Sequence, residues 1–328
     1  MNTNVIIPGA TVSPPSPNTT GLAVEQKVAF AILVILLLVA PLLMYPVFML
    51  RMLCFAMFAC AFNLLIGFSG LLAFGHAAFF GMGSYVAAWT AKSAGVSPEL
   101  AILLGGLTGA GMGVVFGMIA IRRQGVYFAM ITLALAQFVY FLANQVPFTG
   151  GEDGIQAVPR GHLFGILDLR SDLTMYWFVA ALFLIVFLGI YRFVHSPFGQ
   201  VLKAIRENEQ RAMSLGYDVN RYKLIAFTMS SAITGLAGGA KAISLGFATL
   251  TDVHFMISGE GILMTLLGGI GTFFGPVVGA ALLIFIEVQL ASFGAWFGFI
   301  QGAIFVICVL MIQRGIVGEI AHRFKLKL

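Results

Sequence analysis

Apolar segments long enough to cross a lipid bilayer follow one another along most of this chain of 328 residues. A transmembrane helix needs about 20 predominantly apolar residues. Only 9% of the residues are charged, whereas a soluble protein carries about a quarter. The sequence therefore predicts an all-α, polytopic transmembrane bundle of about ten spans. We expect these spans at residues 28–46, 48–70, 74–92, 99–121, 126–146, 176–194, 224–247, 257–272, 275–293 and 297–313.

Two of these spans have a second interpretation. Segments 74–92 and 257–272 are rich in glycine, and they are also compatible with re-entrant helices that enter and leave on the same side. The sequence GFSGLLAFG (67–75) lies at the start of the first segment, and the similar sequence GGIGTFFG (268–275) lies at the end of the second. Their similarity hints at a duplicated unit. Glycines also recur every four residues, a spacing that predicts close helix packing, with flexible hinges as the alternative. These are Gly105, Gly109, Gly113 and Gly117, and then Gly271, Gly275 and Gly279.

One polar segment interrupts the apolar runs at residues 203–223, KAIRENEQRAMSLGYDVNRYK. Its spacing predicts an amphipathic helix with a solvated charged side, which is the pattern of a helix that seats in a groove of a partner. The alternative is an ordinary surface helix that joins two spans. The expected apolar side consists of Val201, Leu202, Ile205, Ala212, Met213 and Leu215.

The basic residues predict how the chain lies in the membrane. Lys and Arg are enriched in cytoplasmic loops, and placing both termini in the cytoplasm leaves few of them outside. The predicted organisation is a flexible tail (1–27), a transmembrane domain (28–314) and a basic cytoplasmic tail (315–328). Within the domain, residues 147–174 form an outer loop and residues 195–223 a cytoplasmic loop. Because the basic residues lie beside spans rather than in one patch, the net charge of +5 does not indicate nucleic-acid binding.

The motifs of common enzymes are absent from the sequence. It contains no GxxxxGK[ST] phosphate loop, no HExxH, no CxxC and no GxSxG. Cys54, Cys60 and Cys308 lie in apolar runs and predict neither a metal site nor a disulfide framework. We therefore expect no metal, cofactor or ATPase site in this chain, so that another subunit would bind ATP if ATP drives transport. A secondary transporter or channel, or an intramembrane enzyme or structural subunit, are the alternatives.

A few polar residues lie inside the expected spans. Burying an ionisable group in a bilayer costs at least about 2.5 kcal/mol, so such groups usually face the bundle interior or a wet cavity. They are candidates for a translocation pathway, and the alternative is that they only bond neighbouring helices. The candidates are Asn63, His76, Gln137, Glu260 and Glu287.

Four motifs in order carry a resemblance to a known family. The run from Asn63 to Tyr85 resembles the signature of the permeases of branched-chain amino acid ABC importers, the LivH/LivM class. Further similar motifs lie at 149–154 (TGGEDG), 204–223 and 267–280. The resemblance covers roughly residues 50 to 315, and the long TGG-containing loop favours a LivM-like member. Glu152 stands where the family commonly has Ser.

The resemblance implies partners and a solute. A LivH-like second permease, two cytoplasmic ATPases that bind ATP and Mg, and a periplasmic binding protein would assemble in the bacterial inner membrane. The solute would be leucine, isoleucine or valine, with urea or short amides as the alternative. Residues implied in coupling to the ATPase are Ala204, Arg206, Glu207, Asn208, Glu209, Arg211, Leu215 and Gly216. Residues implied in the loop that meets the binding protein are Thr149, Gly150, Gly151, Asp153 and Gly154.

Overall fold

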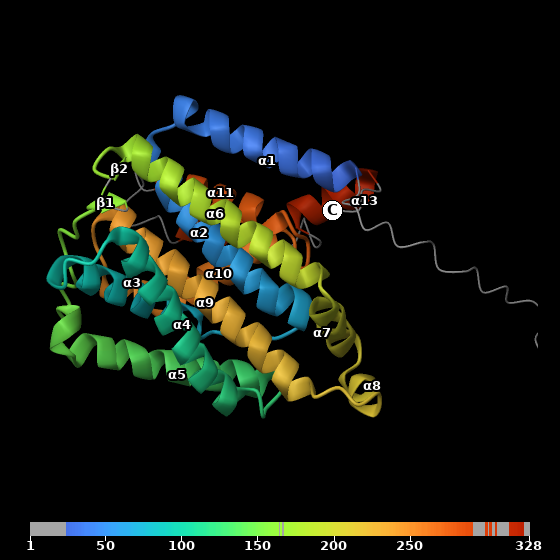
Figure 1. Cartoon of the computed structure of the whole chain (residues 1–328). Coiled ribbons are helices and arrows are strands. Elements are labelled where there is room, and N and C mark those ends of the chain that lie inside the picture. Colours follow the sequence, from blue (N-terminus) through green and yellow to red (C-terminus); the bar gives the residue numbers. More distant parts are fainter. Residues whose placement is uncertain are drawn as a thin grey trace, which may run out of the picture.

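The computed structural model describes residues 24–163, 165, 167–290 and 315–324, with a few positions between 299 and 306. Its helices run mostly along one direction, and most connecting segments lie at the two ends of the bundle (Figure 1). The longer helices are α1 (Val24–Leu43), α2 (Pro46–Asn63), α3 (His76–Ser93), α4 (Pro98–Ala120), α5 (Val126–Gln145), α6 (Asp172–His195), α9 (Val219–Leu245), α10 (Phe255–Gly268) and α11 (Gly275–Leu290). The short ones are the π-helix η1 (Leu64–Ser69), η2 (Pro147–Thr149), α7 (Pro197–Glu207), α8 (Glu209–Ser214), η3 (Leu250–Val253) and α13 (Ile316–Phe324).

The expected helical class is confirmed, with one small addition. Two-residue strands β1 (His162–Leu163) and β2 (Leu167–Asp168) pair antiparallel inside the loop between α5 and α6. Nothing in the alternation of that loop signalled a hairpin. Every expected span before residue 293 coincides with a helix, while span 297–313 lies largely outside the described residues.

Four helical segments are long and apolar enough to cross a membrane by length and composition. They are 46–69, 98–120, 126–145 and 172–195, and shorter apolar helices cover 27–41, 255–268 and 275–290. The number of ten spans therefore stays a prediction. Span 257–272 was placed too long, because α10 ends at Gly268 and Gly269 leaves helical geometry with φ +123°.

Helices α4 and α9 are packed closely against each other. Helix α9, orange in Figure 1, contacts α2, α3 and α4. Gly109 of α4 lies so near the backbone of Ser231 and Gly235 that a side chain there would collide with α9. Gly105 lies equally close to the carbonyl groups of Gly83 and Gly235. The predicted close packing of the glycine series is confirmed, because backbones that approach this closely gain dispersion contacts in lipid.

Two irregular turns interrupt the bundle near the end that carries α7. We call residues 67–75 the first glycine turn, which joins η1 to α3, and residues 268–275 the second glycine turn, which joins α10 to α11. Gly70 and Gly271 adopt φ +72° and +78°, a conformation that L side chains rarely take. The two turns, which carry the similar phrases of the sequence, touch each other at Gly67 and Gly271.

Helices extend into the described parts of both expected tails. Helix α1 begins at Val24 and docks through Phe30, whose ring contacts those of Phe187 and Phe274. After residue 315, α13 packs on α10 and α11, with Val317 buried. The remaining residues of both expected tails lie outside the described residues.

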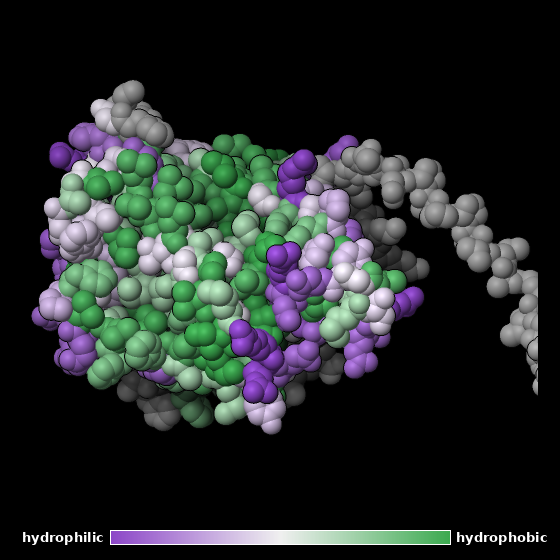
Figure 2. Space-filling view, turned by 60° about the horizontal axis from the view of Figure 1, so that its bottom comes forward, coloured by the Kyte–Doolittle hydropathy of each residue, from purple (hydrophilic) through white to green (hydrophobic). Residues whose placement is uncertain are grey.

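The surface divides into a hydrophobic band and hydrophilic ends. In Figure 2, hydrophilic residues gather toward the two ends of the long direction of the bundle, with a broad hydrophobic surface between them. Large apolar side chains are exposed on several helices, such as Leu107 on α4, Phe138 on α5 and Ile185 on α6. Such a surface is stable against lipid and unstable against water. The chain is therefore an integral membrane protein.

Candidate functional site

Two short helices, α7 and α8, project at one end of the bundle, to the lower right in Figure 1. Pro197 occupies the first turn of α7, and the Ser196 hydroxyl accepts a hydrogen bond from the backbone N–H of Gly199 at 3.3 Å. Asn208 ends α7 in an extended conformation, and its side chain accepts from the N–H of Arg211 at 2.9 Å. This is how a capping residue satisfies the free donors of a helix start.

The expectation of one amphipathic helix over residues 203–223 is therefore wrong in its detail. The Asn208 side chain competes for backbone donors and breaks the segment into two helices. Helix α9 already begins at Val219, five residues before the expected span 224–247, because Asp218 caps it by accepting from the N–H of Arg221.

The apolar side of the segment is smaller than expected. Leu202, Ile205 and Ala212 are buried, as the pattern predicted. Met213 and Leu215 are 51% and 70% exposed, because the break at Asn208 turns α8 so that only Ala212 faces inward. Two apolar side chains at a polar, solvated end form a surface suited to a protein partner.

Most of the residues that the resemblance implies in coupling lie on this surface. Ala204, Glu207, Asn208 and Arg211 are exposed, and Gly216 closes α8 with φ +87°. We call α7, α8 and the turn up to Asp218 the α7–α8 face.

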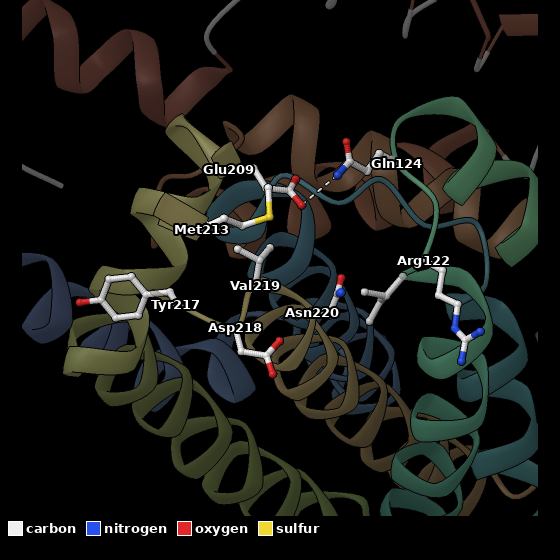
Figure 3. Close-up of a pocket in the computed structure, with 9 residues that line it drawn as sticks. Arg122, Gln124, Glu209, Met213, Tyr217, Asp218, Val219 and Asn220 are labelled. Carbon is white, nitrogen blue, oxygen red and sulfur yellow. Dashed lines mark hydrogen bonds between the residues drawn. The ribbon is translucent and has the colours of Figure 1, made fainter. Parts of the chain in front are cut away.

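Glu209 fastens α8 to the bundle (Figure 3). Its Oε2 lies 2.6 Å from Nζ of Lys223 on α9, and its Oε1 accepts from Nε2 of Gln124 at 2.9 Å. Gln124 belongs to the turn between α4 and α5. The side chain of Lys223 is only 6% exposed, so this ion pair is screened less than a surface pair.

A groove of about 410 Å³ opens beside this ion pair. In Figure 3, residues from the α4–α5 turn, from α8 and from the start of α9 surround it. Charged, amide and apolar groups are mixed in its lining, which favours a protein surface over a small apolar ligand. The lining consists of Ile121, Arg122, Gln124, Glu209, Met213, Tyr217, Asp218, Val219 and Asn220.

Two basic residues of α7 contact the first glycine turn. The Arg206 guanidinium donates through Nη1 to the carbonyl of Gly67 in the first glycine turn. Lys203 Nζ lies 5.7 Å from the centroid of the Phe68 ring. Partial burial lowers the pKa of Lys203, because it removes water from the charged ammonium. Arg206, implied in contact with an ATPase, is exposed and also contacts the first glycine turn.

The predicted pathway residues have different bonding partners. Asn63 is bonded to the second glycine turn, and His76 Nε2 lies 2.9 Å from the hydroxyl of Ser230 on α9. Glu287 accepts from Arg51 at 2.7 Å, and Glu260 lies within electrostatic range of both. Gln137 is half-buried on α5. Asn63 and Glu287 therefore bond neighbouring elements, the alternative that the sequence left open.

The loop with the TGG motif is built tightly at the opposite end of the bundle. The hydroxyl of Thr149 donates to the carbonyls of Ala143 and Val146 at 2.6 Å. Gly150, Gly151 and Gly154 all have positive φ, and neighbouring Ile155 forms a β-bridge with Ala248. Asp153 is exposed. This loop therefore has a defined conformation and presents a defined surface.

The comparison with known families agrees with this arrangement. Residues 45–309 match the model of the family described as "Branched-chain amino acid transport system / permease component". The chain belongs to this family. The permease is 30% identical to the LivM protein of Salmonella typhimurium, and 29% identical to that of Escherichia coli, over 81% of its own length and 68% of theirs. These relatives are described as high-affinity branched-chain amino acid transport system permease proteins.

The family is broader than one solute. The permease is also 28% identical, over 61% of its length and 58% of the relative's, to the Autoinducer 2 import system permease protein LsrC of Klebsiella pneumoniae. No solved structure matches the permease.

Sequence reasoning missed several residues that build the sites of the permease. Gln124 was not singled out, Arg51 was counted only as a basic residue, and Lys223 only as a basic and motif residue. The partners of Gln124 and Arg51 lie far away in the sequence. Lys241 forms a buried ion pair with Asp252 at 2.7 Å, which holds the turn that pairs with the TGG loop. A lysine inside an apolar span was a signal of a buried partner.

Proposed function

We propose that this permease is the membrane-spanning subunit of an ATP-driven importer of leucine, isoleucine and valine. The observation that carries the proposal is the α7–α8 face: two capped helices project beyond the hydrophobic band beside a groove of about 410 Å³. The similarity to LivM proteins over 81% of the chain supports the choice of solute.

The partners follow from this proposal. Two ATPase subunits, which bind ATP and Mg, would contact the α7–α8 face on the cytoplasmic side. A periplasmic binding protein would contact the TGG loop at the other end. A LivH-like subunit would complete the pathway, and a LivH protein of Escherichia coli is 22% identical to this chain. The complex would lie in the bacterial inner membrane, with both termini of this chain cytoplasmic.

The mechanism would be alternating access. A ligand shifts a conformational equilibrium only by the difference between its affinities for the two states. Because the sequence lacks a phosphate loop, the energy of ATP must enter through contacts with other subunits. The exposed side chains of Met213 and Leu215 and the groove beside Glu209 offer that contact. Motion of the ATPases would then move α7 and α8 against the bundle.

Uptake into liposomes tests the function. The chain, its co-purifying subunits and the binding protein are reconstituted, and uptake of labelled leucine is measured with and without ATP. We expect uptake that requires ATP. Parallel assays with urea and with autoinducer 2 decide the solute, since uptake of either instead of leucine would change the cargo. Uptake of leucine by this chain alone without ATP would contradict the proposal and indicate a secondary transporter or channel.

A double variant tests the coupling surface. Glu207→Ala with Arg211→Ala removes two exposed charges from α7 and α8, so membrane insertion should be unchanged. We expect ATP-dependent uptake to fall at least tenfold, because the charges orient the ATPase contact. The matched control is Arg221→Ala, an exposed arginine on the first turn of α9. Normal uptake by the double variant would exclude this surface from coupling.

A further inference from the structure

Asn63, at the end of α2, bonds to the second glycine turn across more than two hundred residues of sequence and lies beside Gly67 of the first turn. Its Nδ2 donates to the carbonyl of Thr272 at 2.9 Å, and its Oδ1 accepts from the N–H of Gly271 at 2.9 Å. The side chain is buried at the end of α2. A buried amide that satisfies both a donor and an acceptor of one turn fixes that turn against α2.

Arg206 joins the same place from α7. Its guanidinium donates to the carbonyl of Gly67, and Nη1 lies 3.5 Å from where a Cβ on Gly271 would stand. Its Cγ lies 3.1 Å from the corresponding point on Gly70. One side chain of the α7–α8 face thus lies against both glycine turns.

The backbone of the turns needs these partners. The π-helix η1 and the positive φ of Gly70 and Gly271 take carbonyl and N–H groups out of regular helical bonding. Irregular backbone at membrane depth is tolerated only where protein or water satisfies it. A hydrogen bond from a charged donor is roughly twice as strong as a neutral one. Arg206 therefore holds the first turn more firmly than a neutral side chain would.

Helix α8 is attached elsewhere. Glu209 fastens it to Lys223 of α9 and to Gln124 of the α4–α5 turn, whereas α7 bonds the glycine turns. Asn208 lies between them in an extended conformation. The two helices of one face therefore hold two different parts of the permease, with a break in the helix between them.

We propose that Arg206 is the positioning residue that transmits movement of α7 to the glycine turns, and that Asn63 makes the two turns move together. This inference rests on the proposed function, because the movement of α7 comes from the ATPases. A guanidinium has five donors in a rigid fork, so it keeps a directed bond to a carbonyl while α7 tilts. The turns in turn set the positions of α3 and α11, which begin at their ends.

The first test separates transport from ATP hydrolysis. In the full complex in liposomes, Arg206→Gln and Arg206→Lys are compared with the unaltered chain for leucine uptake and for ATP hydrolysis stimulated by the binding protein. For Arg206→Gln we expect hydrolysis within twofold of the unaltered complex and at least tenfold less leucine imported per ATP. Arg206→Lys should recover part of the ratio, since it keeps the charge. Arg192→Gln, at an exposed arginine in the last turn of α6, is the control and should leave the ratio unchanged.

The result that overturns the inference is an unchanged ratio of leucine to ATP in Arg206→Gln. An unaltered complex that imports no leucine with ATP would instead overturn the proposed function, so the two failures are distinguishable.

A cysteine pair tests the contact itself, whether or not the variants above assemble. The Cβ of Arg206 lies 3.8 Å from the Cβ position of Gly70, which is the usual separation in a disulfide. We expect Gly70→Cys with Arg206→Cys to form a disulfide in native membranes on mild oxidation. Pairing Gly70→Cys with Arg221→Cys is the control and should not cross-link. Where Gly70→Cys alone reaches the membrane and supports leucine uptake, so that the turn at φ +72° is intact, absence of the first disulfide would show that α7 does not contact the first glycine turn.

Discussion

The α4–α9 pair and the two glycine turns are both rich in glycine, but glycine has a different structural role in each. On α4, Gly109 has ordinary helical geometry and lets two straight helices touch backbone to backbone. In the turns, Gly70 and Gly271 have positive φ and let the chain leave the helix. The glycines of α4 form a helix interface made largely of backbone atoms. The glycines of the turns form irregular backbone that is held by hydrogen bonds with Asn63 and Arg206. A close-packed region and an irregular region thus arise from one residue type, and on our proposal only the irregular one moves.

The largest effect is expected where the rigid pair is forced apart. In Gly109→Leu the new side chain meets the backbone of Ser231 and Gly235, and a backbone cannot yield as a side chain can. We expect a loss of about 3 kcal/mol or more, seen as loss of monodisperse protein in detergent and a lower melting temperature. Gly111→Leu on the same helix has no atom within 4 Å of its Cβ and should behave as the unaltered chain. Equal behaviour of the two variants would contradict the close packing.

The next effect is expected at the link between the turns. Asn63→Leu removes both bonds to the second glycine turn and leaves the N–H of Gly271 without its partner. An unsatisfied buried group costs about 2 kcal/mol, which should appear in the melting temperature of the purified chain. Gln137→Leu, a half-buried amide on α5, is the matched control and should change stability by less than about 0.5 kcal/mol.

A smaller effect is expected when glycine is replaced by alanine, and the change in stability should have opposite signs at two positions. Gly271→Ala has to hold φ +78°, which costs about 1.5 kcal/mol. Gly189→Ala lies in regular α6 with no atom within 4 Å of its Cβ, so it should stabilise the chain by about 0.5 kcal/mol. Thermal melts of both variants check this prediction. Stabilisation by both would mean that the turn does not hold the positive φ.

The smallest effect is expected at the attachment of α8. Glu209→Gln leaves Lys223 without its counter-charge, but the carboxylate is 24% exposed and the new amide still accepts from the lysine. We expect a loss of about 1 kcal/mol or less, measured by thermal melt, and a faster rate of proteolysis at residues 208–218. Arg221→Gln serves as control. A larger loss of stability in Glu209→Gln than in Asn63→Leu would contradict this order of effects.

The sequence was sufficient for the close-packed α4–α9 pair and insufficient for the irregular glycine turns. Long apolar runs and the four-residue spacing of Gly105 to Gly117 predict spans and close packing, because both depend on local periodicity. The bonds of Asn63 and Arg206 join residues 208 and 139 positions away in the chain, and no periodicity reports such contacts. Asn63 was accordingly predicted for a pathway.

The α7–α8 face shows the same limit within one segment. Its position and amphipathic character follow from the sequence, since charges cluster there and Leu202 and Ile205 have helical spacing. The break at Asn208 does not follow from the sequence. Whether Asn208 continues α7 or caps α8 depends on the packing of Ala212 and Val219. The exposure of Met213 and Leu215 follows from that break.

Distances between spin labels in the reconstituted transporter test the contrast between the two regions most directly. The native cysteines are replaced by alanine, and labels are placed on α4 at Leu107 with either α9 at Ile225 or the second glycine turn at Ile270, all exposed positions. On addition of ATP under conditions that trap the closed ATPases, the distance from 107 to 225 should stay the same while the distance from 107 to 270 shifts by several ångströms. An unchanged distance from 107 to 270, or an equal shift in both, would contradict a rigid α4–α9 pair beside movable glycine turns.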